Sequence, residues 1–300
     1  MDKAHGYADK TIEEIEKELK DIYATAQKQL AVKAEAYMNK FIAADEKQRK
    51  LLEKGELSKQ DYTKWLKKKV MSGQRFTKMK EQCAEQLSHA NQIAIDHINN
   101  RMADVYAVSY NALEKDVKGI SGYSFHIVSP DTVKTLAGKD SSMLPYKKLD
   151  PAKDIPWNMK AINSEVLQGV LQGESVKSIT ERVFGYTTKT GANEAEIAHK
   201  MRVAAARTAQ TLITTAENKG RQDSYDRAAK DGVIIEKEWL AIIDAVVRDS
   251  HRELNGICVP EDEPFPNGLM YPGDPSGEPE EVYGCRCSMA AVVKGFRKVR

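Results

Sequence analysis

The chain has 300 residues, of which 41% are hydrophobic, 30% are charged and only 7% are aromatic. This composition can fill a core, but it suits a helix-rich protein better than one dense globule. No apolar run approaches the roughly 20 residues that a membrane-spanning helix needs. The first residues also lack the apolar segment of a secretory signal. We therefore expect a protein of about two domains that is kept in a cytosol-like compartment and has no membrane partner.

Charge is distributed unevenly along a chain whose formal net charge is only +2. Residues 253–285 hold eight acids and no Lys or Arg, so the rest of the chain has about ten more basic than acidic residues. Residues 62–80 hold no acid and seven basic residues, namely Lys64, Lys67, Lys68, Lys69, Arg75, Lys78 and Lys80. These predict either a solvated lysine face or a surface for DNA phosphates or an acidic partner. Aromatic residues are too few there to favour a platform that stacks single-stranded bases.

Residues 1–118 contain no proline and only three glycines, which is the main signal for helix in this part of the chain. Ile12, Ile15, Leu19 and Ile22 step by three and four, and Tyr23, Ala26 and Leu30 widen the same face. Gly55 and Gly73 are expected breaks, and Ser58 is placed to cap a helix that buries Tyr62, Leu66 and Val70. Ile95, Ile98, Met102 and Val105 predict a third helix.

The middle of the chain is less regular. Residues 123–128 alternate and are rich in β-forming residues, which predicts a short strand. Past Pro156 the pattern is helical again, with Ile162, Val166 and Val170 on one face and Gly173 as the C-terminal cap.

Ser175 can cap a short helix, and Asn193 with Glu196 has the form of a capping pair. A long helix then runs to about Lys230, with Ile197, Met201, Ala204, Ala205, Thr208 and Leu212 along its apolar stripe. Residues 239–243 and 290–293 predict strands.

Together these patterns predict an α+β protein that is predominantly helical. An extended N-terminal helical arm covers residues 1–118, and an irregular linker covers residues 119–156. A compact domain with a few short strands and a proline-rich loop covers residues 157–300.

The last fifty residues hold six of the ten prolines and three of the four cysteines. Irregular backbone of this kind cannot satisfy its own hydrogen bonds as a helix does, so other groups must fix it. His251, Cys258, Cys285 and Cys287 are ligand types that zinc prefers, and together they predict a closed structural site with three cysteines and one histidine. In Cys285–Arg286–Cys287 one intervening residue places both thiolates on the same side of an extended backbone.

Other interpretations of these four residues stay open. The cysteines could pack as small reduced hydrophobic residues, and Cys258 could form a disulfide, which a cytosolic protein disfavours. His251 could be a structural histidine that Asp244 or Asp274 holds. Cys83 lies in a helical pattern and is expected to be buried.

Several motifs in the second half resemble one known family. Arg248, His251, Leu254 and Gly256 precede Tyr271-Pro272-Gly273-Asp274-Pro275 and Cys285-Arg286-Cys287. Trp157, Gly173-Glu174-Ser175, Ala206-Arg207-Thr208 and Trp239 occur in a matching order upstream. This arrangement over about residues 150–290 resembles the phage head morphogenesis family, the minor capsid proteins related to phage Mu protein F and to the gene 7 product of phage SPP1. Ala209 and Gly284 depart from the family pattern, and neither change removes a candidate metal ligand.

The resemblance implies a protein of the phage head that is not an enzyme. Such a protein associates with the portal during procapsid assembly in the host cytoplasm, then stays inside the head and affects DNA retention or delivery. Scaffold, major capsid protein and packaged DNA are further expected partners. Arg207, Trp239, Arg248, Gly256 and Asp274 would be structural residues of the motif. Possible structural zinc is the one cofactor expected.

A runner-up is a DNA-binding protein of the head interior that uses residues 62–80. An enzyme is the third possibility, because Arg207, Arg248, His251 and Glu253 could form the site of a hydrolase or an ADP-ribosyltransferase. No phosphate-binding loop, zinc-protease motif or nucleophile elbow supports it.

Overall fold

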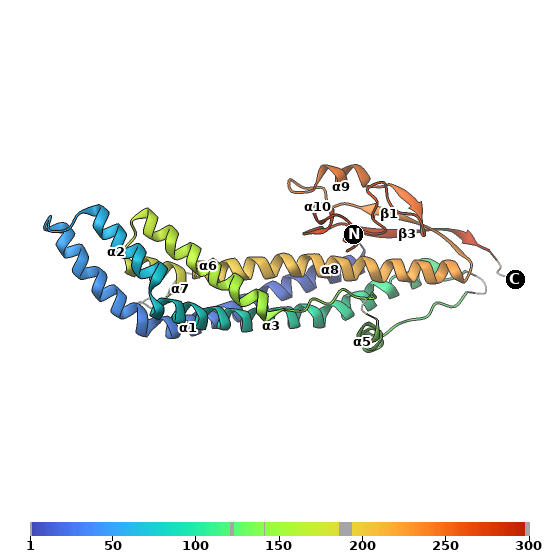
Figure 1. Cartoon of the computed structure of the whole chain (residues 1–300). Helices are drawn as coiled ribbons and strands as arrows, with labels where there is room; N and C mark the ends of the chain where they lie inside the picture. The colour runs from blue at the N-terminus through green and yellow to red at the C-terminus, as the bar shows by residue number, and fades with distance from the viewer. Residues whose placement is uncertain (1, 121–122, 141, 186–193, 298–300) are drawn as a thin grey trace. The chain divides into compact units, whose positions relative to one another are not determined.

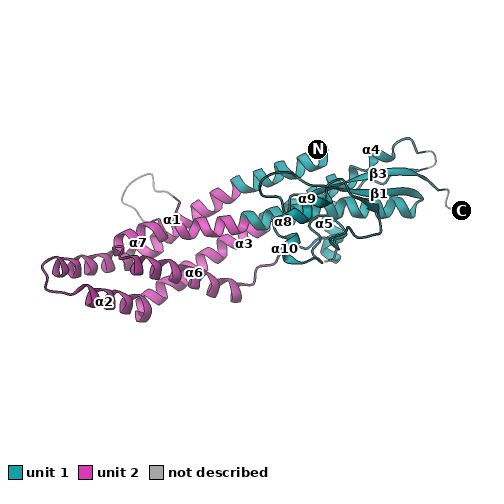
Figure 2. Ribbon diagram, turned by 90° about the horizontal axis from the view of Figure 1, so that it is seen from above, with its two compact units in different colours: residues 1–17, 96–147, 206–300 teal, residues 18–95, 148–205 magenta. Residues whose placement is uncertain are grey.

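The structure is a computed structural model that describes residues 2–120, 123–140, 142–185 and 194–297. The chain divides into two compact units, shown in Figure 2. Residues 1–17, 96–147 and 206–300 form what we call the sheet unit, and residues 18–95 and 148–205 form the helical unit. Each unit therefore combines segments that are far apart in the sequence. The predicted division into domains at residues 1–118, 119–156 and 157–300 stays a prediction.

Three long helices contribute residues to both units. They are α1 (Lys3–Glu53), α3 (Gln74–Asn111) and α8 (Glu196–Lys230) (Figure 1). The helical unit also contains α2 (Lys59–Ser72), α6 (Pro151–Gln172) and α7 (Val176–Phe184). Among the described residues, no helix is long and apolar enough to cross a membrane.

Apolar residues at helical spacing form the core of the helical unit, as predicted. Within α1, the buried residues of this unit follow steps of three and four: Leu19, Tyr23, Ala26, Leu30, Ala34, Met38 and Phe41. Ile22 is only half-buried, so the stripe is centred on Tyr23 rather than on Ile22. Tyr62, Leu66 and Val70 of α2 are buried, and so are Ile162, Val166 and Val170 of α6.

The predicted helix ends are confirmed. The Ser58 hydroxyl accepts a hydrogen bond from the Asp61 backbone N–H at 3.1 Å, and Ser175 caps α7 in the same way through Ser178 at 3.0 Å. Gly173 ends α6 in the left-handed conformation, with φ at +78°, which favours glycine. The predicted Asn193 cap lies outside the described residues.

The sheet unit is built around a three-stranded antiparallel sheet in the order β2-β1-β3. Its strands are β1 (Val233–Leu240), β2 (Cys258–Pro260) and β3 (Ser288–Phe296). The short helices α4 (Glu114–Val117), α5 (Pro130–Lys139), α9 (Asp249–Leu254) and α10 (Pro279–Val282) belong to the same unit. Burial alternates along β1, so one face of this strand packs into a core that includes Trp239, Phe265 and Met289.

The predicted α+β class, predominantly helical, is confirmed, but two strand predictions were wrong in detail. Residues 123–128 are irregular and belong to no described sheet, because β-propensity forms a strand only where a partner edge is available. The strand predicted at 239–243 begins at Val233 and ends at Leu240, and Ile243 is 54% exposed. The apolar run beyond Leu240 therefore forms surface loop rather than buried sheet.

We predict that Leu30→Ala lowers the free energy of unfolding of the helical unit by about 2–5 kcal/mol, because it opens a cavity at a side chain with no solvent exposure. Val32→Ala is the matched control on the same helix, since Val32 is 71% exposed and should change stability by less than about 0.5 kcal/mol. Urea denaturation followed by circular dichroism measures both. Equal losses in the two variants would contradict the packing of α1.

Candidate metal centre and basic groove

A row of polar side chains on α8 holds the irregular C-terminal segment in place. Thr214 Oγ1 donates to the Cys285 carbonyl at 2.9 Å, and Asn218 Nδ2 donates to the Cys287 carbonyl at 3.0 Å. Thr215 Oγ1 donates to the Gly273 carbonyl at 2.7 Å, and Gln222 Nε2 donates to that of Glu261 at 2.7 Å. Thr214, Asn218 and Gln222 are four positions apart, and Thr215 lies three positions before Asn218, so the four residues share one face of the helix. They supply the hydrogen bonds that proline-rich backbone cannot make with itself.

A buried lysine fixes the middle of the same segment. The Lys237 side chain, on β1, has no solvent exposure, and its Nζ donates to the Met270 carbonyl at 2.8 Å and to Gln222 Oε1 at 3.0 Å. Burial lowers the pKa of Lys237 to about 8, although nearby carboxylates act in the opposite direction. Asp274, which the sequence singled out, accepts hydrogen bonds from the backbone N–H groups of Met270 and Ser276. Its carboxylate therefore shapes the loop instead of holding His251.

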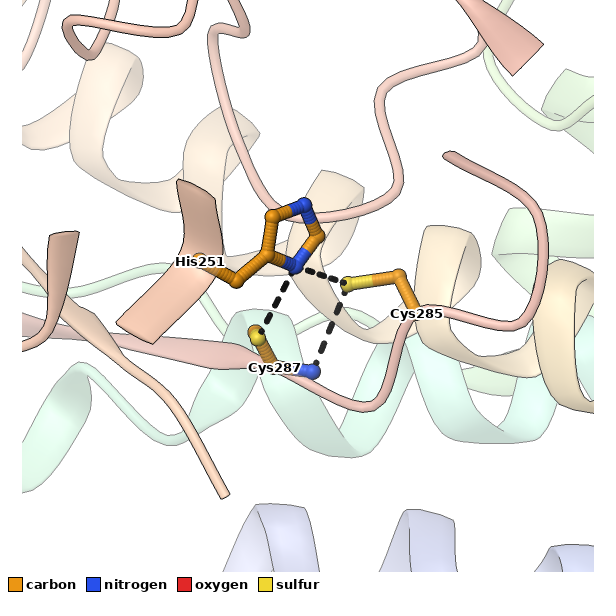
Figure 3. Close-up of side chains that lie close together, drawn as sticks. All are labelled: His251, Cys285 and Cys287. Atoms are coloured by element: carbon orange, nitrogen blue, oxygen red, sulfur yellow. Dashed lines mark hydrogen bonds between the residues drawn. The ribbon is translucent and has the colours of Figure 1, made fainter. Parts of the chain in front are cut away.

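Three of the four predicted metal ligands meet in one place (Figure 3). His251, on α9, is 1% exposed, and Cys285 and Cys287, just before β3, are 1% and 3% exposed. His251 Nδ1 lies 3.4 Å from Cys287 Sγ and 3.7 Å from Cys285 Sγ. All three ligand atoms lie within 4.8 Å of one another. Tetrahedral zinc with ordinary Zn–N and Zn–S bonds separates such atoms by about 3.6 Å, so the group has nearly the spacing that zinc requires.

Glu281 orients the histidine ring. Its Oε2 lies 2.9 Å from His251 Nε2, so the carboxylate accepts a hydrogen bond from Nε2–H, and Nδ1 faces the cysteines. Burial acts to raise the pKa of Glu281, but hydrogen bonds from Ser250, Asn267 and His251 lower it overall. Glu281 therefore stays ionised. The predicted partners of His251, Asp244 and Asp274, are both wrong. Asp244 instead pairs with Arg286 at 2.6 Å, and Asp274 binds backbone N–H groups of its own loop.

The two cysteines interact with each other and with His251. A hydrogen bond from Cys285 lowers the pKa of Cys287, and the neighbouring His251 and Trp239 lower it further against the effect of burial. The Cys287 backbone N–H also lies 3.4 Å from Cys285 Sγ. A thiolate beside an oriented imidazole is the form in which cysteine binds a metal.

Cys258 does not join this group. It lies on β2, is exposed, and pairs in register with Glu238. A side chain that faces solvent on an edge strand cannot reach a buried site, so the predicted four-ligand set is reduced to three. A cavity of about 20 Å³ adjoins the group and is lined by Arg248, His251 and Cys287, among others. That is room for about one water molecule, which can fill a fourth coordination position.

The other predicted motif residues mostly support this centre. Trp239 is fully buried and lies edge-on to His251, with ring centroids 5.2 Å apart. Gly256 has φ at +82° and donates its N–H to the Trp239 carbonyl at 2.8 Å. The Arg248 guanidinium donates to the Tyr283 carbonyl. Arg207 is the exception, because it is exposed on α8 and forms no ion pair among the described residues.

The predicted basic stretch divides into two sets. Lys69, Arg75 and Lys78 line a groove of about 520 Å³ in the helical unit, together with Lys33 and Lys40 of α1. Tyr37 and Phe41 also line it, and no acid does among the residues that the structure describes. Lys64 instead pairs with Asp61 at 3.6 Å, Lys80 donates to Asn163 at 2.9 Å, and Lys67 and Lys68 do not line the groove. Lys33 and Lys40 could not be predicted as part of this groove, because they lie next to the other cations only through the packing of α1 against α2 and α3.

Residues 160–290 match the family model described as Phage Mu protein F like protein. The chain is also 24% identical over 298 residues to minor head protein GP7 of Bacillus phage SPP1, a match that covers 96% of this chain and 85% of that protein. The chain is therefore similar to phage minor head proteins, over residues 160–290 by the family model and along most of its length by this relative. The C-terminal motif that resembles this family in the sequence lies in the segment that α8, Lys237 and His251 hold in place.

A second relative carries a different name. The chain is 26% identical over 244 residues to NAD(+)--arginine ADP-ribosyltransferase EFV of Enterococcus faecalis. That match covers 71% of this chain but only 47% of the relative, so the chain spans about half the length of that protein. No solved structure matches the chain.

The buried lysine predicts a pH dependence. Because the folded pKa of Lys237, about 8, lies below the unfolded value of 10.5, the unfolded state binds more protons between these two pH values. This group therefore adds stability as pH rises from about 8 to 10.5, by at most about 3 kcal/mol. Urea unfolding of the wild type and of Lys237→Met over this range isolates the effect. A stability difference between the two proteins that does not change with pH would contradict it.

Proposed function

We propose that the chain is a structural, non-enzymatic component of the phage head that acts in procapsid assembly at the portal. The observation that carries this proposal is the similarity to a minor head protein along 96% of the chain. Assembly takes place in the host cytoplasm, and the protein then stays in the virion interior. The portal protein is the first partner, and scaffold and major capsid protein are further ones.

A structural zinc ion bound to His251, Cys285 and Cys287 completes the proposal. The donor set, its burial and the oriented histidine support zinc over harder ions, which prefer oxygen ligands. A metal here joins α9 to the segment that leads into β3 and so closes the long loop between them. The free energy of zinc binding would therefore contribute to folding, because the three ligands come together only in the folded chain.

Three protein ligands and one open position also describe many catalytic zinc sites. Two features favour the structural role. The adjoining cavity of about 20 Å³ has room for a water molecule but none for a substrate. Of the other residues considered for an enzyme site, Arg248 holds the Tyr283 carbonyl, and Glu253 is exposed and does not line this cavity.

We predict that the purified wild-type protein contains about one zinc per chain by elemental analysis, and that Cys285→Ser/Cys287→Ser loses it. Cys258→Ser is the matched control, because this thiol is exposed and outside the group, and it should keep the metal. The same variants introduced into the phage genome test the head role. Mass spectrometry of purified virions should detect the wild-type protein and the Cys258→Ser variant, and less of the double variant.

The two parts of the proposal fail separately. A folded wild-type protein without metal would remove the zinc and leave the head role standing. Absence of the wild-type protein from virions would contradict the head role, whatever the zinc content. Turnover of a substrate that depends on His251 in a protein that remains folded would restore the enzyme interpretation.

A second function, DNA binding, is favoured by the basic groove. Five cations from three helices meet there without an acid among the lining residues, which is the arrangement that attracts a phosphate backbone. This function is compatible with the first, because a protein of the head interior lies next to packaged DNA. The groove also identifies which lysines would contact DNA, which the sequence alone does not.

We predict that Lys69→Ala/Arg75→Ala/Lys78→Ala weakens DNA binding and makes it less dependent on salt, because three phosphate contacts are lost. The slope of log K against log salt should fall by up to about 3. Lys64→Ala/Lys67→Ala/Lys68→Ala removes the same charge outside the groove and is the control. Equal losses in both triple variants would show that net charge, and not the groove, binds DNA.

A further inference from the structure

A second open cavity lies in the sheet unit. It has a volume of about 800 Å³ and is lined by residues from three separate segments. Pro145 and Lys147 precede α6, Arg207, Thr208, Thr211 and Leu212 lie on α8, and Tyr283 and Gly284 precede the metal ligand Cys285. A cavity of this size suits a ligand or a protein segment rather than a few waters. We call it the α8 cavity.

Both cations of the α8 cavity lack a carboxylate partner. Arg207 and Lys147 are exposed, form no ion pair among the described residues, and no acid lines the cavity. The backbone of Lys147 is fixed by reciprocal hydrogen bonds with Asn99, at 2.8 and 3.1 Å, and its Nζ lies 3.4 Å from Thr208 Oγ1. Two positive charges without a carboxylate partner among the described residues, one of them on a backbone that Asn99 holds, therefore line one open space, which favours an anionic occupant.

The same cavity exposes apolar surface. Thr208 and Leu212 belong to the stripe of α8 that the sequence predicts to be buried, yet here they line an open cavity and are only partly covered. Tyr283, which is 66% exposed, also lines the cavity, and Pro145 adds a further apolar side chain. An aromatic side chain and an arginine around an uncovered apolar stripe are typical of protein interfaces.

Phosphate ligands fit this cavity less well. The one glycine N–H of its wall, that of Gly284, already donates to Thr211 Oγ1 at 2.9 Å, so no array of free N–H groups is present to bind a phosphate. Two cations are also fewer than the five that meet in the basic groove. An acidic protein segment with apolar flanks matches the cavity better, because it pairs carboxylates with the cations and apolar groups with Tyr283 and Leu212.

The chain itself carries a segment of this chemistry. Pro260-Glu261-Asp262-Glu263-Pro264 follows the edge strand β2 and is largely exposed. A hydrogen bond from the Glu263 N–H to the Pro260 carbonyl, at 3.1 Å, closes it into a turn, and Gln222 holds the Glu261 carbonyl. None of its three carboxylates forms an ion pair among the residues that the structure describes. A preformed turn loses little conformational freedom on binding.

We propose that the α8 cavity binds the acidic turn, residues 260–264, of a second copy of this chain. The two patches are different surfaces of one molecule, so the contact is head-to-tail. Repetition of such a contact gives a ring or an open chain of copies, depending on the rotation between neighbours. This contact forms between copies of the chain and requires neither DNA nor the portal.

Paired charge reversals test this contact. We expect the wild-type protein to self-associate with rising concentration in sedimentation velocity at low salt. Lys147→Glu/Arg207→Glu and Glu261→Lys/Asp262→Lys/Glu263→Lys should each weaken self-association about tenfold or more, because like charges then face one another. An equimolar mixture of the two variants should associate again, since each altered patch now meets its complement. Recovery in the mixture also excludes misfolding as the cause of the losses.

Cross-linking locates the contact independently. Cys258 is the exposed thiol on β2, two residues before the turn, whereas the other three cysteines are buried. Pro145→Cys places a second thiol on the rim of the α8 cavity, and a short bismaleimide should then join neighbouring copies; Pro145→Cys/Cys258→Ser is the control. A wild-type protein that stays monomeric at all concentrations tested would overturn the proposal. Self-association that both charge-reversed variants retain, without cross-links between the two positions, would overturn it as well.

Discussion

The sheet unit depends on hydrogen bonds between the polar face of α8 and the carbonyls of a segment that has little regular structure of its own. Thr214, Thr215, Asn218 and Gln222 each reach a different part of residues 261–287. A buried carbonyl without a donor costs free energy, so this segment folds in one way only where α8 supplies its donors. The helix is in turn long enough to present such donors over several successive turns.

This arrangement connects the candidate site to the surfaces around it. Thr214 and Asn218 hold the carbonyls of Cys285 and Cys287, and these residues place both sulfurs against His251. Thr211 holds the N–H of Gly284, which belongs to the wall of the α8 cavity. A metal at the centre and an occupant of the cavity therefore act on neighbouring residues of one segment. Assembly through this surface would depend on the centre being intact.

Helices and caps could be predicted from the sequence because their signals are local. Ser58 and Gly173 act through neighbours a few residues away, and the stripe from Leu19 to Phe41 follows helical periodicity alone. The site was predictable in part. His251, Cys285 and Cys287 stood out by residue type, whereas the exclusion of Cys258 and the role of Glu281 depend on tertiary contacts that spacing does not encode. Lys33 and Lys40 were missed for the same reason, and the threonines of α8 resembled ordinary helix surface.

Amide hydrogen exchange, measured on the wild-type protein with and without a zinc chelator, separates the two ways in which the C-terminal segment is held. α8 and Lys237 hold residues 261–287 through hydrogen bonds, and a metal would add a second constraint at residues 281–287. The chelator should therefore accelerate exchange in 281–287 while 270–276 stay protected. Unchanged exchange in 281–287, or loss of protection in both regions together, would contradict it.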